Sequence, residues 1–278
     1  MKVKLFPKSI TLFITLIIIG LWSSPLFSRE KSIRIGIGKV KTSLYIKGKF
    51  GKKYKSWKFS KNGSKLLING KKKRYSKIIL YGSSKKPIIY KSIKYWGNVE
   101  LYCYGSYLYV VNVLSMENYI KGVVPKEIGA SVKPEALKAQ AVVARSYAIA
   151  MMGKHKKEGF DLCNRTHCQV YGGKSAETVK SNKGVTATRG IVVLSNKKVI
   201  APFYHAYCGG MTATPNEAWA GAKYSKNFIS VKCEGCEKHN YWWKAKIGEN
   251  KFLSKLKTTL SSTDTQPKRL FRNLLTIG

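Results

Sequence analysis

One long helix that must be surrounded by other structure is the strongest constraint that this sequence places on its fold. Pro134 suits the first position of a helix, Glu135 complements the helix dipole, and Gly153 is a natural stop. Apolar residues lie on nearly every side of the predicted helix: Leu137, Ala139, Ala141, Val142, Val143, Ala144, Tyr147, Ala148, Ile149 and Met151. A helix that is apolar all round is buried, so we expect it at the centre of a domain.

The residues before this helix predict β structure. Between Ser32 and about Val113, short apolar-rich runs are separated by glycine, asparagine, serine and lysine: IRIGIG, SLYIKGKF, KLLING, KIILYG, VELYCYG and YLYVVNV. These are strand and turn signals. An amphipathic stretch from Glu117 to Val123, ending at Pro125, precedes the long helix, and the β pattern returns after about Gly190.

The predicted fold class is therefore α+β. A β-rich N-terminal region, residues 29–112, leads into a mixed α/β domain, residues 113–247, built round the long helix. Residues 248–278 form a polar C-terminal tail.

The first 28 residues predict export. Lysines precede an apolar run over residues 10–22, and small or turn residues follow it, as in a secretory signal peptide of residues 1–28. The alternative is an uncleaved N-terminal anchor, which would be the protein's only membrane contact. We expect an exported protein of the periplasm or cell envelope.

The net charge of +39 first suggests nucleic acid as a partner. An exported protein, however, meets anionic envelope polymers and lipid head groups, and the lysines are spread through the strand region. We therefore expect no nucleic-acid partner. The equally simple alternative to a specific site for anionic polymers is a solvated, lysine-rich surface.

Glu127 is the first candidate for chemistry. The chain has only 13 acidic residues against 52 basic ones, and this carboxylate lies among Val123, Val124, Pro125 and Ile128. Apolar surroundings are unusual for a surface carboxylate. The alternative is a first-turn residue that complements a helix dipole.

Polar residues on the long helix form a second candidate group. Lys138 and Arg145 are two turns apart and project from one face, with Ser131 and Gln140 nearby. They either face a cleft that contains Glu127 or form an exposed stripe on a half-buried helix.

Three motifs resemble the SpoIID/LytB family of bacterial cell-wall proteins: VVPKEIGASVKPEALKAQAVVARSYA, DLCNRTHCQVYGG and FYHAYCGGMTATPNEAW. They occur in the family's order, and the similarity extends from about Val111 to Trp243.

The resemblance implies a peptidoglycan lytic transglycosylase that cleaves the MurNAc–GlcNAc β-1,4 bond and leaves 1,6-anhydro ends. Glu127 would be the general acid and base, with no cofactor required. By the same resemblance, Lys138 and Arg145 match basic residues that the family needs for activity. The other residues that we expect to bind the glycan are Gln140, Ser131, Gln169 and Tyr171. The alternative within the family is a non-catalytic enhancer that binds a cell-wall amidase.

The sequence does not decide whether the cysteines bind zinc or form disulfides. Cys163, His167 and Cys168 have spacing that suits structural zinc, and the resemblance implies zinc beside the active site, but export favours a disulfide. Cys208, Cys233 and Cys236 predict a disulfide or a second metal site. Cys103 lies in a predicted strand and is expected to be a buried apolar residue.

Overall fold

A computed structural model describes residues 32–71, 75–218, 228–238, 248 and 254. The chain divides into two compact units, Met1–Ala206 and Tyr207–Gly278. The sequence had instead predicted domain boundaries between residues 112 and 113 and between residues 247 and 248. The predicted signal peptide lies outside the described residues, as does the predicted tail except Gly248 and Ser254.

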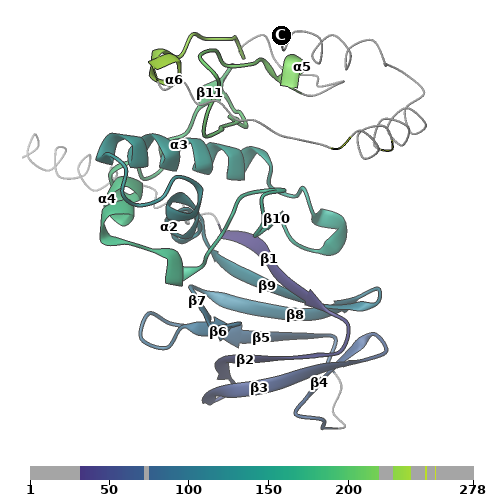
Figure 1. Ribbon diagram of the computed structural model, residues 1–278. Coiled ribbons are helices and arrows are strands. Elements are labelled where there is room, and N and C mark those ends of the chain that lie inside the picture. Colours follow the sequence, from purple (N-terminus) through teal and green to yellow (C-terminus); the bar gives the residue numbers. More distant parts are fainter. Residues whose placement is uncertain (1–31, 72–74, 219–227, 239–247, 249–253, 255–278) are drawn as a thin grey trace, which may run out of the picture. The chain divides into compact units, whose positions relative to one another are not determined.

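The first unit contains one large sheet that is antiparallel except at one edge (Figure 1). Its main path runs β10-β1-β9-β8-β5-β2-β3-β4, and β6 and β7 extend from β2. Among the described strands, only β10 pairs in parallel, with β1. The strands are β1 (Ser32–Val40), β2 (Ser43–Phe50), β3 (Lys53–Asn62), β4 (Lys65–Ile68), β5 (Lys77–Tyr81), β6 (Ile88–Tyr90), β7 (Ile93–Tyr95), β8 (Asn98–Tyr104), β9 (Tyr107–Ser115) and β10 (Leu162–Cys163).

One face of the sheet supplies most of the core. Alternate strand residues are fully buried, among them Ile33 and Ile35 on β1 and Val99 and Leu101 on β8. Burying each such large side chain contributes about 1.5–3 kcal/mol. The alternation predicted from the sequence thus provides the apolar face on which the rest of the unit packs.

Cys103 lies where the sheet bends back on itself. Its Sγ on β8 is 3.7 Å from the Lys65 carbonyl oxygen on β4, although β4 and β8 are not paired. Cys103 is half-buried against the core rather than fully buried as predicted.

Helix α2 (Met116–Glu127) packs beside β1 and β9, and two further helices, α3 (Pro134–Ala150) and α4 (Val179–Ala187), pack against α2 and against each other (Figure 1). The Ser115 side chain caps α2 by accepting from the Asn118 N–H. The sequence predicted that this helix ends at Pro125, but α2 continues to Glu127. Pro125 cannot donate the backbone hydrogen bond of a helical residue, and it lies close enough to the C-terminus that only two more residues follow it in the helix.

The long helix α3 begins at Pro134 as predicted and ends at Ala150, three residues before Gly153. Its residues Leu137, Ala141, Ala144 and Ala148 are buried, but Ala139 is exposed, so the helix is buried less completely than the sequence predicted. Helix α4 begins with a capping box formed by Thr178 and Ser181.

The α+β fold class is confirmed. The β structure expected after Gly190 is smaller than predicted. The strands described there are those of one hairpin, β11 (Leu194–Ser195) and β12 (Lys198–Val199). Two short 3-10 helices lie earlier in the unit: η1 (Lys156–Glu158) and η2 (Lys174–Ala176). The second unit contains the short helices α5 (Pro215–Ala218) and α6 (Glu234–Lys238) among its described residues. In the described part of the chain, no helix combines the length and apolar character needed to span a bilayer.

Gly122 sets how closely α2 approaches the loop after β10. A Cβ atom at this position would collide with the Tyr171 ring and lie 2.9 Å from the Gly173 carbonyl oxygen. Both neighbours are held in place, because Tyr171 is buried and the second contact is to backbone. The close packing of α2 therefore requires glycine here.

We predict that Gly122→Ala lowers the free energy of unfolding by about 1–3 kcal/mol through overpacking. The usual effect of this substitution inside a helix is a gain of about 0.5–1 kcal/mol, so the expected sign is reversed. Urea denaturation measures it, with Lys121→Ala on the same helix as the control. A Gly122→Ala protein as stable as the unmodified one would contradict the close packing.

Candidate functional site

Glu127 is the last residue of α2. The next residues end the helix, since the Ile128 N–H donates to the Val124 carbonyl oxygen and Gly129 has a φ of +79°. A helix C-terminus carries partial negative charge and disfavours a carboxylate by about 0.3–1 kcal/mol. Glu127 thus does not complement a helix dipole, which removes the alternative that the sequence left open.

A backbone amide holds this carboxylate in place. The Val170 N–H donates to Glu127 Oε1 over 2.6 Å, and the Glu127 side chain is only half-buried. Val170 lies in the loop that follows Cys168, so the position of Glu127 depends on a segment far along the chain.

A set of buried polar groups extends from Glu127. The Tyr204 hydroxyl interacts with the Glu127 carboxylate, and burial, together with that negative charge, raises the pKa of Tyr204. Gln169 Nε2 donates to the Tyr204 hydroxyl oxygen over 3.4 Å and to the Ala144 carbonyl oxygen over 3.2 Å. The Tyr119 hydroxyl donates to Gln169 Oε1 over 3.3 Å. Tyr204 therefore links the Glu127 carboxylate to the Gln169 amide.

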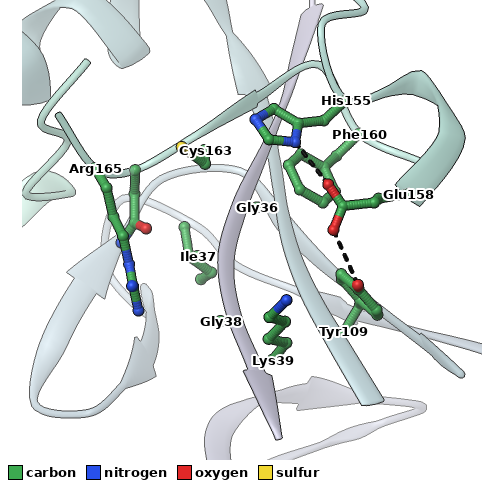
Figure 2. A pocket seen from close by; sticks show the side chains of 11 residues that line it. Gly36, Ile37, Gly38, Lys39, Tyr109, His155, Glu158, Phe160, Cys163 and Arg165 are labelled. Carbon is green, nitrogen blue, oxygen red and sulfur yellow. Dashed lines mark hydrogen bonds and ion pairs between the residues drawn. The ribbon is translucent and has the colours of Figure 1, made fainter. Parts of the chain in front are cut away.

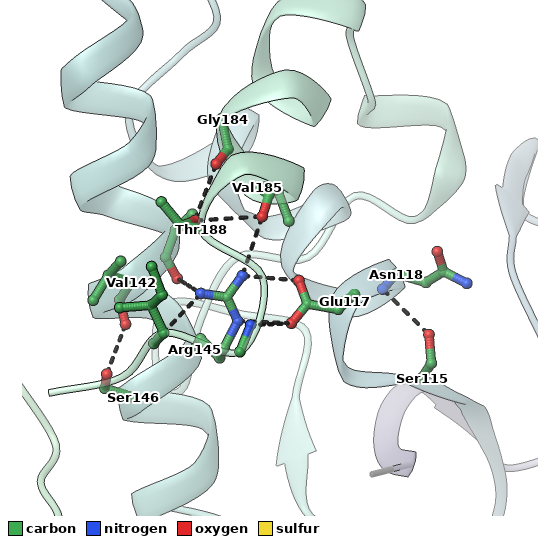
Figure 3. Close-up of polar contacts among 12 residues, drawn as sticks. Ser115, Glu117, Asn118, Val142, Arg145, Ser146, Gly184, Val185 and Thr188 are labelled. Atoms are coloured by element: carbon green, nitrogen blue, oxygen red, sulfur yellow. Dashed lines mark hydrogen bonds and ion pairs between the residues drawn. The ribbon is translucent and has the colours of Figure 1, made fainter. Parts of the chain in front are cut away.

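Arg145 does not face Glu127. Its guanidinium is buried and binds both oxygens of Glu117, with Nε–Oε1 and Nη2–Oε2 distances of 2.8 Å (Figure 3). It also donates to the carbonyl oxygens of Ile191, over 3.0 Å, and Val185, over 3.4 Å. The structure thus places Arg145 in a buried ion pair between α2, α3 and α4 rather than in a glycan-binding cleft.

The other predicted binding residues separate into buried and accessible groups. Gln169 and Tyr171 are almost fully buried, and the Tyr171 hydroxyl donates to Asn112 Oδ1 over 2.9 Å. Gln140 Nε2 is buried with no hydrogen-bond partner among the described residues. Gln169 and Tyr171 are therefore not placed to meet a ligand from solvent, whereas Gln140 as a residue is half-buried.

Lys138 and Ser131 are the accessible members of the predicted set. Lys138 is partly exposed and pairs with Glu135 over 2.8 Å. Ser131 is exposed and its carbonyl oxygen accepts from Lys180. Both residues can therefore be reached by solvent and by a ligand.

Two cysteines and two histidines converge beside the sheet. The ligand atoms of His155, Cys163, His167 and Cys168 all lie within 4.8 Å of one another. The distances are 3.5 Å from His155 Nε2 to Cys168 Sγ, 3.7 Å from His167 Nδ1 to Cys163 Sγ and 3.6 Å from His167 Nδ1 to Cys168 Sγ. The donor set of two nitrogens and two sulfurs fits tetrahedral zinc.

The sequence-based prediction of the metal site did not include His155. Its ring stacks on Phe160, with centroids 4.7 Å apart, and its Nδ1 lies 2.6 Å from Glu158 Oε2 (Figure 2). Glu158 in turn accepts from the Tyr109 hydroxyl over 3.0 Å. A carboxylate on the outer nitrogen is the usual support of a metal-binding histidine.

The charge near His167 also suits a metal ligand. Lys154 donates to the His167 carbonyl oxygen over 2.8 Å. Its positive charge lowers the pKa of His167, which favours the neutral imidazole that binds metal.

The described residues of this unit also line a pocket of about 190 Å³ next to the cluster (Figure 2). Gly36 and Lys39 of β1 lie on its wall, together with His155, Cys163 and Arg165. The pocket thus connects the metal-binding residues with the edge of the sheet.

Comparisons with known proteins agree with the motifs. Residues 104–194 match the model of the SpoIID family, described as stage II sporulation protein. This chain carries a SpoIID-family domain. The matched residues include Glu127, the Arg145–Glu117 pair and the four metal-binding candidates, and they exclude Tyr204 and most of the sheet.

Curated relatives of this SpoIID protein include two from Bacillus subtilis. An uncharacterized protein of Brachyspira hyodysenteriae is 33% identical over 200 residues, 67% of this chain and 54% of the relative. A B. subtilis amidase enhancer is 41% identical over 103 residues, 37% of this chain and 14% of that protein. B. subtilis stage II sporulation protein D is 30% identical over 127 residues, 40% of this chain and 37% of that protein. The match thus spans about half of the Brachyspira relative's length and less of the others.

We predict that Arg145→Met lowers the free energy of unfolding by about 3–5 kcal/mol, because it leaves the Glu117 carboxylate buried without its partner. The double variant Glu117→Leu/Arg145→Met should recover much of the loss, since neither charge then remains. Denaturation of the two single variants and the double variant gives the coupling energy. Additive losses would mean that the two side chains do not act as a pair.

Proposed function

We propose that this SpoIID protein is a peptidoglycan lytic transglycosylase of the cell envelope, exported from the cytoplasm, that cleaves the MurNAc–GlcNAc β-1,4 bond. The observation that carries the proposal is the Glu127 carboxylate, half-exposed at a helix end and held by the Val170 N–H and Tyr204. A carboxylate fixed in this way can approach a glycosidic oxygen from one side.

A single carboxylate suffices for this reaction. Glu127 protonates the leaving oxygen, and its carboxylate then accepts the proton of the MurNAc 6-hydroxyl as that oxygen attacks the anomeric carbon. The products are a free GlcNAc 4-hydroxyl and a 1,6-anhydro-MurNAc end. No water is consumed, so no second carboxylate is needed to activate one.

The distribution of acidic residues supports a one-carboxylate reaction. An ordinary glycosidase requires two carboxylates on opposite sides of the bond. In residues 32–71 and 75–206, the carboxylates other than Glu127 are each engaged elsewhere: Glu100 with Arg34 and Lys77, Glu117 with Arg145, Glu135 with Lys138, Glu158 with His155, Asp161 with the Arg34 N–H, and Glu177 with Trp96 and Asn182.

Tyr204 has a positioning role in this proposal. Because Gln169 donates to its oxygen, the Tyr204 hydroxyl hydrogen points to Glu127. It stabilises the carboxylate after the proton has gone to the leaving oxygen. Lys138 and Ser131 remain the accessible candidates for binding the glycan.

We predict that Glu127→Gln lowers the rate of 1,6-anhydro end formation by about 10²–10⁴-fold, the usual contribution of a general acid–base group. The assay uses purified glycan strands with and without stem peptides, and mass spectrometry of the products. Glu135→Gln, in the first turn of α3, is the matched control and should retain activity. Unchanged yield of anhydro ends in Glu127→Gln would refute the proposed role.

A second function is favoured by the 41% identity to the B. subtilis amidase enhancer. In this alternative the domain binds a cell-wall amidase and increases its activity without cleaving glycan. Stimulation of the cognate amidase by both the unmodified protein and Glu127→Gln, with no anhydro products from either, would support the enhancer.

We also propose that His155, Cys163, His167 and Cys168 bind a structural zinc ion. The zinc would hold together the loop that presents the Val170 N–H to Glu127, and it takes no part in proton transfer. The support is the convergence of the four ligand atoms and the Glu158 carboxylate behind His155.

We predict that His155→Ala and Cys168→Ser each remove one zinc equivalent relative to the unmodified protein and lower its melting temperature. Elemental analysis and thermal denaturation measure the two effects, with the exposed His205 changed to alanine as the control. If the unreduced protein instead contains a Cys163–Cys168 disulfide, peptide mapping will detect it and the zinc proposal is wrong.

A further inference from the structure

The second unit contains a thiol cluster that the proposed reaction does not use. The sulfur atoms of Cys208, Cys233 and Cys236 all lie within 4.8 Å of one another, and all three residues are half-buried free thiols. Three thiolates around one zinc ion, at Zn–S distances of about 2.3 Å, would lie roughly 3.8 Å apart. The spacing of the cluster is thus compatible with a shared metal.

The backbone brings Cys208 to the other two residues. Gly209 and Gly210 follow it with φ values of +70° and +105°, a conformation that favours glycine. This turn lets the Gly210 carbonyl oxygen accept from the Cys233 N–H over 2.7 Å. Met211 then forms a bridge with Lys232.

The C-x-x-C segment supplies the other two sulfurs. Helix α6 begins immediately after Cys233, and Cys236 lies in its first turn. Side chains of a helix tilt towards its N-terminus, which directs the Cys236 thiol back to Cys233.

Among the described residues, the paired backbone segments around the three cysteines bury little apolar surface. Met211, Ile229 and Val231 lie in or beside the paired segments and are 60%, 70% and 52% exposed. Short segments that bury little apolar surface are commonly stabilised by a metal or a disulfide. A disulfide would join two of the thiols and leave the third unused, whereas a metal ion would use all three.

We propose that Cys208, Cys233 and Cys236 form a zinc-binding site that is separate from the His155 cluster and stabilises the second unit. Zinc binding would displace the three thiol protons, and the ion would complete its tetrahedral coordination with a fourth ligand. The site does not depend on the transglycosylase proposal, because Glu127 takes no part in it.

The test uses the full chain with the first cluster removed, as the double variant His155→Ala/Cys168→Ser. We expect it to retain one zinc equivalent, with a sulfur-dominated first coordination shell by X-ray absorption. Adding Cys208→Ser or Cys236→Ser should abolish this zinc, while adding Cys103→Ser, the matched control, should not.

Folding and oxidation are checked separately. Cobalt titration of the otherwise unmodified double variant detects thiolate coordination without changing any of the three cysteines. Absence of zinc and of cobalt–thiolate absorption would overturn the proposal, as would peptide mapping that finds two of the three thiols joined in a disulfide in the unreduced protein. Absence of Glu127-dependent glycan cleavage would contradict the transglycosylase proposal but not this zinc site, because Glu127 takes no part in it.

Discussion

The buried ion pair between Arg145 and Glu117 organises the helical half of the first unit. Burying two charges is costly unless nearly all their hydrogen-bonding capacity is used, and this guanidinium meets both carboxylate oxygens and nearby backbone carbonyls. The pair therefore permits only a narrow range of arrangements of α2 and α3. Since Glu127 is the last residue of α2, a contact about three turns away helps to determine where the Glu127 carboxylate lies.

Local signals were sufficient for much of the fold. Pro134 marked the start of α3, and alternating runs marked the strands, because these features depend on neighbours in sequence. The partner of Arg145 could not be predicted in the same way, since Glu117 is 28 residues away and only packing brings the two together. An arginine on an apolar helix was interpreted as a ligand-binding group, although a buried acidic partner explains it equally well.

The candidate site was predicted in part. Glu127 was identified by its apolar neighbours and by the family motif, whereas the Tyr204 hydroxyl beside it was not predicted. His155 was overlooked because it lies eight residues before Cys163, a longer spacing than those of short metal-binding motifs. Its role becomes visible only when the turn after α3 brings its ring to the cysteines and Glu158 binds its other nitrogen.

The domain that carries the motifs also includes the first strand, so it extends further towards the N-terminus than the motifs suggest. β1 begins at Ser32, yet it pairs with β9 along its length and with β10 at Leu162 and Cys163. The Arg34 guanidinium also donates to the Gly159 carbonyl oxygen. Residues far outside the family match thus pair with the short strand that opens the loop of candidate metal ligands. A fragment cut to the motif-bearing segment alone would leave β9 and β10 without the strand that joins them.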